Sequence, residues 1–358
     1  MINQISIKNF KSIQDLNLQL LPLNILIGAN GSGKSNFISF FKFLNNLYFQ
    51  QLQNYVAEQA GAENILHFGL KKSDFLFGKI QFDDKNKYYF NLKPNNEGSL
   101  YLEKEGTNFN TDYYGIWDDV AIPTNNHKES KLIELKQGRY YYVNSYMQSF
   151  KIFHFHDTSN TAKIKQKSNI DDNSFLRENG QNLAAYLYFL QEKHPKDFKK
   201  IEKTIQSIAP FFDKFVLQPD RIREDQIRLE WQEKNSDMYL NATHLSDGTL
   251  RFMVLATLLL QPNLPKVIII DEPELGLHPF AINKLAGLIK KASAQSQIII
   301  ATQSVNLIDN FEPEDIITVD RKEGQSVFQR QSSETLKDWL TEYSIGDLWN
   351  KNVIGGRP

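Results

Sequence analysis

The sequence predicts an α/β protein with a mixed-sheet core, and three apolar segments carry that prediction. Residues 23–27, 266–270 and 297–301 are short runs dominated by apolar side chains without polar alternation. Such runs are typical of strands that are buried on both faces. Residues 36–47 follow the first run and carry apolar side chains at helical spacing. The core is therefore expected to begin with a buried strand that leads into a helix.

The composition excludes several classes of function. The chain has 358 residues, of which 41% are hydrophobic and 23% charged, as in ordinary globular proteins. A formal net charge of −1 excludes a globally basic nucleic-acid-binding protein, although a local basic face remains compatible with it. The absence of cysteine excludes disulfides, thiolate catalysis and Cys-ligated zinc. Because neither a membrane span nor a signal peptide is recognisable, we expect a soluble, cytoplasmic protein.

The segment after the first buried strand matches the P-loop pattern G-x-x-x-x-G-K-[ST]. It consists of Gly28, Ala29, Asn30, Gly31, Ser32, Gly33, Lys34 and Ser35. Glycines let successive backbone N–H groups point at phosphate oxygens, and the following helix adds the positive end of its dipole. Lys34 would reach the β- and γ-phosphates, and the Ser35 hydroxyl would bind Mg²⁺. The alternative, a glycine-rich turn without a ligand, is disfavoured because a buried strand precedes the pattern and a helix follows it.

A second buried strand, over residues 266–270, leads directly into Asp271 and Glu272. A carboxylate at the end of a buried strand is costly unless it meets a cation, so Asp271 is expected to bind Mg²⁺. Glu272 points to the opposite side, where the γ-phosphate and an attacking water would lie. The structural alternative for an acidic pair is a helix N-terminus. The P-loop in the same chain favours the catalytic interpretation.

Two further segments narrow the subclass. Ser246, Asp247 and Gly248 precede an apolar helix expected over 252–260, and they offer an anion a hydroxyl, N–H groups and a helix dipole. The third buried strand is followed by Thr302, Gln303 and Ser304. The order of these four motifs along one chain is much more specific than any one of them.

This order resembles that of ABC-type ATPases of the RecF, SMC and OLD kind, within the broad group of AAA-family predicted ATPases. Residues 244–251 resemble their signature motif, usually LSGGQ, and residues 274–279, ELGLHP, resemble the segment that crosses their dimer interface. The opening ISIKNFKS is similar to their N-terminal strand and turn, which implies that Lys11 and Ser12 lie near the nucleotide. Asn36, directly after the P-loop, is expected among the nucleotide-binding residues as well. The stretches HFHDTS, NLAAYL and GDLWNKNVIGGRP are typical of one compact bacterial subfamily.

The resemblance implies an ABC-ATPase architecture and a homodimer that sandwiches ATP in two composite sites. Ser35 and Asp271 would then hold Mg²⁺, and Glu272 would polarise the attacking water. The signature residues of one subunit, Ser246 and Gly248, would complete the site in the other. Most of the catalysis would be positioning and charge stabilisation.

Two positions depart from the pattern of the resembling ATPases. Gln303 stands where the group usually has a histidine, so it could donate a hydrogen bond to the γ-phosphate but carries no titratable charge. His278 stands where the group often has an aspartate, which would alter communication between subunits. Slow turnover is the hypothesis that follows.

We expect a single two-lobed domain over residues 1–358. Alternating aromatic and polar residues at 87–92, 99–102 and 138–143 predict an antiparallel sheet, with turns at 95–98 and 125–126. Two helices are expected over 174–208, broken near His194 and Pro195, and strands return at 215–217 and 227–231. No coiled-coil heptads occur. The expected parts are a P-loop part of the core (1–73), an antiparallel β lobe (74–172), a small helical insert (173–210) and a signature-containing C-terminal part of the core (211–358).

Three weaker features of the sequence, a pair of histidines, a run of lysines and two glutamines, each allow more than one interpretation. His154 and His156 share one strand face and could suggest a metal site, but a structural or nucleotide-proximal role is favoured because no third ligand can be named. A run of lysines over 193–203 could touch a nucleic-acid backbone, although interspersed acids favour a solvated helix face. Gln148 and Gln166 are both candidates for the glutamine that couples the lobes in related ATPases.

Three biological roles are compatible with these motifs. The first is an ATPase that acts on DNA ends or structures in repair or anti-phage defence. The second is an ATP-gated scaffold that contacts no nucleic acid and controls a separately encoded effector, such as a nuclease. The third, the nucleotide-binding subunit of a membrane transporter, is disfavoured because the signature lacks its terminal glutamine and the intervening lobe is unlike a transporter subunit.

Overall fold

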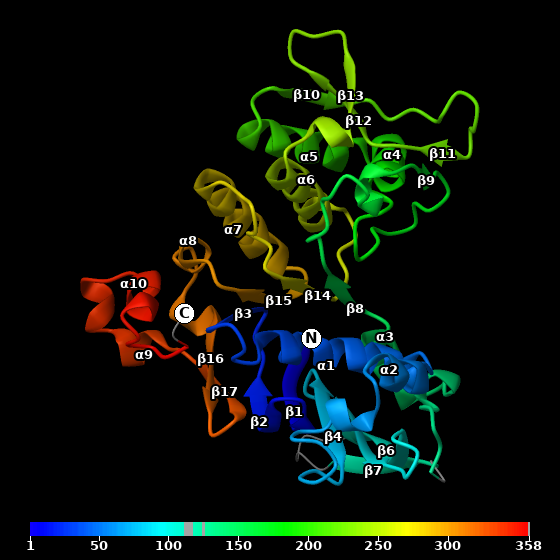
Figure 1. Cartoon of the computed structure of the whole chain (residues 1–358), viewed down its shortest axis with the longest axis vertical. Coiled ribbons are helices and arrows are strands. Elements are labelled where there is room, and N and C mark those ends of the chain that lie inside the picture. The colour runs from blue at the N-terminus through cyan, green and yellow to red at the C-terminus, as the bar shows by residue number, and fades with distance from the viewer. Residues whose placement is uncertain (111–116, 124–125, 357–358) are drawn as a thin grey trace.

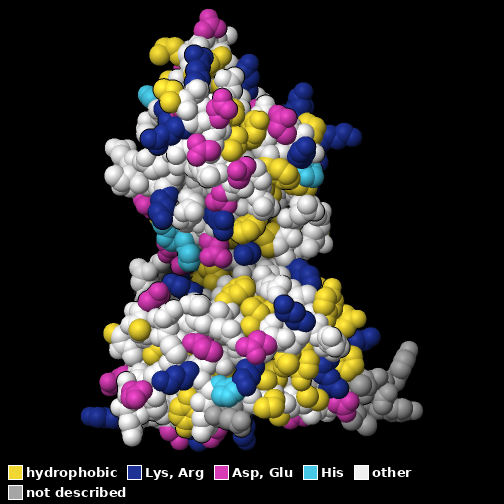
Figure 2. All heavy atoms as spheres, turned by 90° about the vertical axis from the view of Figure 1, so that its right-hand side faces the viewer, with side chains coloured by type: hydrophobic (Ala, Val, Ile, Leu, Met, Phe, Trp, Pro, Cys, Tyr) yellow, Lys and Arg dark blue, Asp and Glu magenta, His cyan; other side chains and the backbone are white. Residues whose placement is uncertain are grey.

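The computed structural model describes residues 1–110, 117–123 and 126–356 of the chain. They form two lobes on either side of a central sheet, with the helical lobe above and an antiparallel sheet below in Figure 1. Figure 2 shows that the molecule narrows between these lobes. The last helices lie at one side of the central sheet (Figure 1).

The central sheet has six strands in the order β17-β16-β3-β15-β14-β8. Strand β17 runs antiparallel to β16, and the other four neighbouring pairs are parallel. The strands are β3 (Leu23–Ile27), β8 (Phe150–Phe153), β14 (Val267–Asp271), β15 (Gln297–Thr302), β16 (Ile316–Lys322) and β17 (Gln325–Arg330). Because parallel strands end at one edge of a sheet, the segments after β3, β14 and β15 lie next to one another.

The central sheet is buried on both faces, as its apolar strands predict. In β15, Ile298 and Ile300 pack into a core that includes α6 (Asp247–Leu260) and α7 (Pro279–Ser293). The alternate residues Ile299 and Ala301 pack into a second core with α1 (Lys34–Tyr48) and the antiparallel sheet. The period-2 geometry of a strand thus lets one apolar run stabilise both lobes.

The lower lobe is built on a six-stranded antiparallel sheet in the order β2-β1-β4-β5-β6-β7. Its strands are β1 (Ile2–Phe10), β2 (Ile13–Gln19), β4 (Leu76–Phe82), β5 (Asn86–Pro94), β6 (Leu100–Asn110) and β7 (Trp117–Ile122). The expected strands near 87–92 and 99–102 are confirmed, with a turn between them at Asn95, whose carbonyl accepts from the Gly98 N–H. The turn expected at 125–126 includes Asn125, which lies outside the described residues.

The upper lobe contains the two helices expected over 174–208. They are α4 (Leu183–Lys193) and α5 (Pro195–Ile208), which are separated at His194 as Pro195 predicts, because proline favours the first position of a helix. Short strands complete this lobe: β9 (Ser168–Asn169), β10 (Phe212–Phe215), β11 (Gln226–Ile227), β12 (Glu230–Glu233) and β13 (Tyr239–Asn241). The remaining helices are α2 (Leu52–Glu58), α3 (Arg139–Met147), α8 (Val305–Ile308), α9 (Ser333–Leu336) and α10 (Ile345–Asn350).

Three expectations about individual strands were wrong. Residues 138–143 are not a strand, because α3 begins at Arg139 and the Asn144 side chain donates to the carbonyls of Leu135 and Tyr140. The strand expected at 215–217 instead ends at Phe215. Strand β8, which lies in the region expected to be an antiparallel lobe, pairs in parallel with β14 in the central sheet. Aromatic β-propensity was overridden by tertiary packing in the first case.

Candidate functional site

The P-loop connects β3 to α1 and leaves the start of that helix open. Gly33 is the N-cap of α1, no side chain caps the helix, and its first turn contains no acidic residue. Gly31 and Gly33 have φ angles of 77° and 120°, which side-chain-bearing residues rarely adopt. The N–H groups at this helix start and its dipole are therefore available to an anion such as a phosphate.

A chain of hydroxyls holds the P-loop against the first strands and the β16–β17 hairpin. Asn36 donates to the Ser12 hydroxyl at 2.7 Å, and the Ser12 and Ser326 hydroxyls are 2.7 Å apart. Ser326 donates in turn to the Ser32 carbonyl at 2.6 Å. A side chain at Gly33 would collide with Ser326. Ser326 is thus a site-forming residue that no motif in the sequence marks.

Lys34 lies buried at the start of α1, with 6% of its surface exposed. Its Nζ donates to the carbonyls of Gly28 at 2.6 Å and Ala29 at 3.0 Å. Burial lowers the pKa of Lys34, and the negative charges of Glu272, Asp271 and Glu274 act in the opposite direction. The P-loop lysine and these three carboxyl groups therefore belong to one electrostatic cluster.

Asp271 is the last residue of β14, and the central sheet places it between the ends of β15 and β8. Burial raises the pKa of Asp271, and the neighbouring charge of Glu272 raises it further. Glu272 has a φ angle of 43°, a left-handed conformation that is unusual for a residue with a side chain. A hydrogen bond from the Glu272 N–H to the Ala301 carbonyl, at 2.8 Å, holds this conformation. Local strain of this kind is often found at functional sites.

The side chain of Gln303 meets Glu272, as their places at the ends of adjacent strands predict. The Gln303 Nε2 donates to the Glu272 Oε1 at 2.7 Å. Glu274, which the sequence interpretation missed, accepts hydrogen bonds from the Thr302 hydroxyl and from the Gln303 N–H. Its other carboxyl oxygen is buried without a hydrogen-bond partner, and burial raises the pKa of Glu274. The only sequence signal for Glu274 is its position just after the two acids.

The donors at this edge fit a magnesium ion. The Asp271 carboxyl is half-buried, and burial together with the Glu272 charge raises its pKa more than His156 and Lys34 lower it, so the protein compensates its charged form only in part. The Ser35 hydroxyl is exposed in the first turn of α1. Hydroxyl and carboxylate oxygens are hard donors of the kind that Mg²⁺ prefers. Ser35 and Asp271 could therefore hold the ion.

The signature segment forms the start of α6. Ser246 is the N-cap, and its Oγ accepts from the Thr249 N–H at 3.2 Å. Asp247 pairs with Lys165, whose Nζ lies 3.3 Å from the carboxylate. A Cβ at Gly248 would collide with the Gly276 carbonyl, so the signature directly touches the 274–279 segment of the same chain. At the end of that segment, His278 caps α7 by accepting from the Phe280 N–H at 3.3 Å.

A cavity of about 420 Å³ adjoins the P-loop and brings together the three N-terminal residues expected near the nucleotide. Lys11, Ser12 and Asn36 line it, together with the buried side chain of His67 and the exposed ring of Phe68. The Lys11 Nζ donates to Gln59 at 3.2 Å. The His67 Nδ1 donates to the Lys11 carbonyl at 2.7 Å, and its Nε2 is buried without a hydrogen-bond partner. His67 carries no signal in the sequence.

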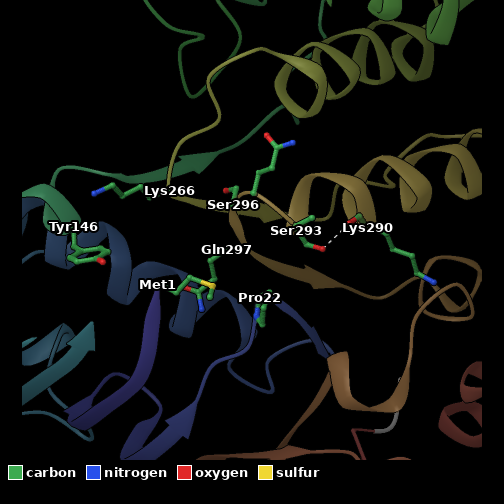
Figure 3. A pocket seen from close by; sticks show the side chains of 10 residues that line it. Met1, Pro22, Tyr146, Lys266, Lys290, Ser293, Ser296 and Gln297 are labelled. Atoms are coloured by element: carbon green, nitrogen blue, oxygen red, sulfur yellow. Dashed lines mark hydrogen bonds between the residues drawn. The ribbon is translucent and has the colours of Figure 1, made fainter. Parts of the chain in front are cut away.

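A larger cavity lies at the opposite edge of the central sheet. Figure 3 shows its lining, which includes Pro22, Lys266 and Gln297. These residues stand at or before the beginnings of β3, β14 and β15, whereas the P-loop and the acidic residues follow the ends of the same strands. This cavity has a volume of about 490 Å³ and is separate from the candidate nucleotide site.

The remaining sequence candidates lie in different surroundings. In the part of the chain that the structure describes, no group of three or more potential ligands could hold a metal ion, so His154 and His156 gain no third ligand. Gln148 precedes β8 and donates to the Tyr48 hydroxyl at 2.8 Å, while Gln166 donates to the Asn160 carbonyl at 3.4 Å. It is His156, and neither glutamine, that contacts the end of β14, with its Nε2 2.8 Å from the Asp271 carbonyl.

Among the described helices, none is both long and apolar enough for a membrane span.

Comparisons with solved structures show the fold. The chain is similar to an SMC head bound to the C-terminal winged-helix domain of ScpA, with a TM-score of 0.63 and 16% identity, covering 94% of this chain and 99% of that one. It is also similar to an SMC head with an extended coiled coil from Pyrococcus furiosus, bound to the C-terminal domain of ScpA. That match has a TM-score of 0.59 and 16% identity, and covers 95% and 98% of the two chains.

Sequence comparisons relate the chain to proteins that are named as ATP-binding and to one protein family. It is 25% identical over 297 residues to a protein of Mycoplasma genitalium named "Putative ABC transporter ATP-binding protein MG303", covering 77% of this chain and 76% of that protein. A shorter match, 31% identical over 88 residues, covers 24% of this chain and 34% of the Thermotoga maritima phosphate import ATP-binding protein PstB. Residues 23–309 match the family described as "AAA domain, putative AbiEii toxin, Type IV TA system". The chain belongs to this family of P-loop ATPases, and its fold is that of an ABC-type SMC head.

Proposed function

We propose that the protein binds and hydrolyses ATP with Mg²⁺ at the edge of the central sheet. The observation that carries this proposal is the convergence of Lys34, Asp271, Glu272 and Gln303 at the ends of neighbouring strands. The P-loop N–H groups and Lys34 would bind the phosphates, and Ser35 and Asp271 would hold Mg²⁺. The ion, when bound, neutralises charge on the phosphate oxygens. Glu272 would accept a proton from the attacking water, and Gln303 would donate to the γ-phosphate.

The active form that we propose is a homodimer with ATP between the subunits. Ser246, Asp247 and Gly248 lie at an exposed or half-exposed helix start, where their N–H groups and hydroxyl can meet a phosphate from a second subunit. The similarity of the fold to an SMC head supports this arrangement, because the resemblance to SMC-type ATPases implies an ATP-sandwiched dimer. Two composite sites would then form, each with the P-loop of one subunit and the signature of the other.

The biological role that we propose is in anti-phage defence or DNA repair, together with a separately encoded nuclease or other effector. The family description, which names a toxin of a "Type IV TA system", supports the defence role. The alternative is an ATP-gated scaffold that regulates a protein effector without contacting nucleic acid, which the net charge of −1 favours. A transporter subunit is the role named for the two ATP-binding relatives. The antiparallel strands β4 to β7, which lie between the P-loop and the signature, argue against that role, because this lobe is unlike that of a transporter subunit.

Replacement of Glu272 tests the proposal. Glu272→Gln keeps the size of the side chain and its hydrogen-bonding reach but removes the charge that activates water. We expect ATP binding to survive, because the contacts of Lys34 and Asp271 stay, and hydrolysis to fall at least ~100-fold, the usual scale for a general base. The uncleaved ATP should then hold two subunits together. Size-exclusion chromatography with light scattering, with and without Mg-ATP, measures this mass change.

Two variants separate binding from closure. Lys34→Ala should lose nucleotide and keep the mass of the nucleotide-free protein. Ser246→Arg should bind ATP in its own P-loop but fail to dimerise, because the larger side chain would occupy the position of the γ-phosphate of the second subunit. Hydrolysis by Glu272→Gln at the rate of the unmodified protein would show that the catalytic residue is assigned wrongly.

A further inference from the structure

One arginine connects the signature helix to two other parts of the site. Arg251 lies on α6, five residues after Ser246. Its Nε donates to the Phe155 carbonyl at 3.1 Å, and its Nη2 donates to the His156 carbonyl at 2.6 Å. Its Nη1 donates to the Leu275 carbonyl at 2.8 Å. The guanidinium thus joins α6 to the segment after β8 and to the 274–279 segment.

Both segments lead directly to groups with proposed roles at the nucleotide. The ring of His156 lies on the acidic strand, where its Nε2 is 2.8 Å from the Asp271 carbonyl, an oxygen that can only accept. His156 therefore connects Arg251 to the residue that would hold Mg²⁺. Leu275 belongs to the segment that follows Glu272 and Glu274 and precedes α7. The Arg251 side chain thereby contacts the segment 271–275 at both ends, at Leu275 directly and at Asp271 through His156.

The contacts of Gly276 with Arg251 and Gly248 are close, so these segments can hardly move relative to one another. Gly276 has a φ angle of 74°, and a Cβ at this position would lie 2.8 Å from the Arg251 Nη1. The Gly276 carbonyl touches Gly248 so closely that a side chain there would collide with it. A planar guanidinium offers several donors in fixed directions, which a lysine ammonium cannot reproduce. A displacement of Asp271 or of the 274–279 segment should therefore move the start of α6 as well.

We propose that Arg251 and His156 form a positioning relay that aligns the signature of a subunit with its own nucleotide site. The relay rests on the proposed function, in which Asp271 acts on the ATP of its own subunit and Ser246 acts on the ATP of the other. ATP binding at one P-loop is thereby transmitted to the signature that closes on the second ATP. Arg251 and His156 are positioning residues, since each acts through the backbone of other residues.

Replacement of Arg251 in two backgrounds tests the relay. In the Glu272→Gln protein, Arg251→Gln should change the affinity for a fluorescent ATP analogue by no more than about twofold. ATP-dependent dimerisation should weaken at least ~10-fold, because misplacement of the signature by about 1 Å has effects of this size or larger. In the otherwise unmodified protein it should lower kcat at least ~10-fold with little change in KM. Arg251→Lys should not restore either property, since charge alone does not satisfy three carbonyls.

The matched control is Arg228→Gln, which removes the same charge from an arginine that pairs with Glu230 in the upper lobe. It should dimerise and hydrolyse ATP like its parent. His156→Ala should reproduce the loss in Arg251→Gln, and the double variant should be no worse than either single one, because coupled residues are not additive. Thermal unfolding of each variant verifies that it is folded.

The outcomes separate the relay from the function on which it rests. Failure of the Glu272→Gln protein to bind ATP or to dimerise would reject the proposed function. Normal dimerisation by folded Arg251→Gln, or additive losses in the double variant with His156→Ala, would reject the relay alone. An equal loss of ATP affinity and of dimerisation would also reject it, because Arg251 would then support the P-loop site generally.

Discussion

Gln303 is a single side chain that we expect to affect the rate of hydrolysis at the proposed site. Its Nε2 donates to Glu272 at 2.7 Å, so the proposed general base already accepts a hydrogen bond before any phosphate is bound. The Gln303 N–H donates to the Glu274 Oε1 at 3.3 Å, and this hydrogen bond fixes the Gln303 backbone. A γ-phosphate would offer Gln303 a second acceptor and release the Glu272 oxygen for water. A neutral amide makes a weaker hydrogen bond to phosphate than a charged donor does, so we expect slow turnover.

Two substitutions of Gln303 should move the hydrolysis rate in opposite directions. Gln303→Ala removes a donor to the developing charge on phosphate, and we expect kcat to fall about 100-fold. Gln303→His restores the residue usual in the resembling ATPases and should raise kcat several-fold, because a protonated imidazole is a charge-assisted donor. The affinity for ATP, measured by fluorescence titration, should change little in both. A higher rate in Gln303→Ala would instead show that the amide only restrains Glu272.

At the scale of elements, strands that are buried on both faces were predictable and contacts between distant segments were not. The apolar runs gave β3, β14 and β15, and Pro195 gave the break between α4 and α5, because these signals are local. The helix α3 was missed since its aromatic residues favour strands. Glu274, Arg251 and Ser326 were missed because their roles arise only when remote segments meet. The pair Arg251 and Leu275 is 24 residues apart, and Ser326 and Ser32 are 294 apart.

Glu105 stabilises the junction between the antiparallel sheet and the segment before α3. Its side chain is 1% exposed and accepts hydrogen bonds from the Tyr88 hydroxyl at 2.7 Å, from the Ser130 hydroxyl and from the Lys131 N–H at 3.2 Å. Burial raises the pKa of Glu105, and the donors from Ser130, Tyr88 and Lys131 reduce that rise. The folded state therefore holds the Glu105 proton more tightly than the unfolded chain does.

The free energy of unfolding should depend on pH through this carboxyl. A pKa that is raised by folding stabilises the protein below the ordinary pKa of the acid, and this contribution is lost as pH rises through the raised pKa. Glu105→Gln cannot ionise, so its stability relative to the unmodified protein should improve as pH rises from about 4 to about 8. Denaturant unfolding across this range measures the difference, with the exposed Glu323→Gln as control. A constant difference would contradict the assignment.

At the scale of the whole molecule, a net charge of −1 means that DNA binding requires a local basic face. The described lysines on and next to α5 provide one candidate. Phe198, Ile201 and Ile205 bury the opposite face of this helix, while Lys196 and Lys203 are exposed. Within the described residues, an ion pair on this helix joins Lys200 to Asp197 at 2.8 Å. The exposed lysines are free to meet the phosphates of DNA, and hydrolysis measurements with DNA test this contact.

Duplex DNA should raise the rate of ATP hydrolysis if the DNA-directed form of the proposed function is correct. The rise should be clear at low salt and shrink as salt increases, since four phosphate contacts would lose roughly 100-fold in affinity between about 50 and 200 mM. The double variant Lys196→Glu, Lys203→Glu should remove most of the stimulation, while the same reversal at the exposed Lys71 and Lys72 of the other lobe should not. ATPase assays with and without DNA measure both. Hydrolysis that DNA leaves unchanged even at low salt would favour the ATP-gated scaffold, because the protein would then lack the counterion-releasing contacts on which DNA binding depends.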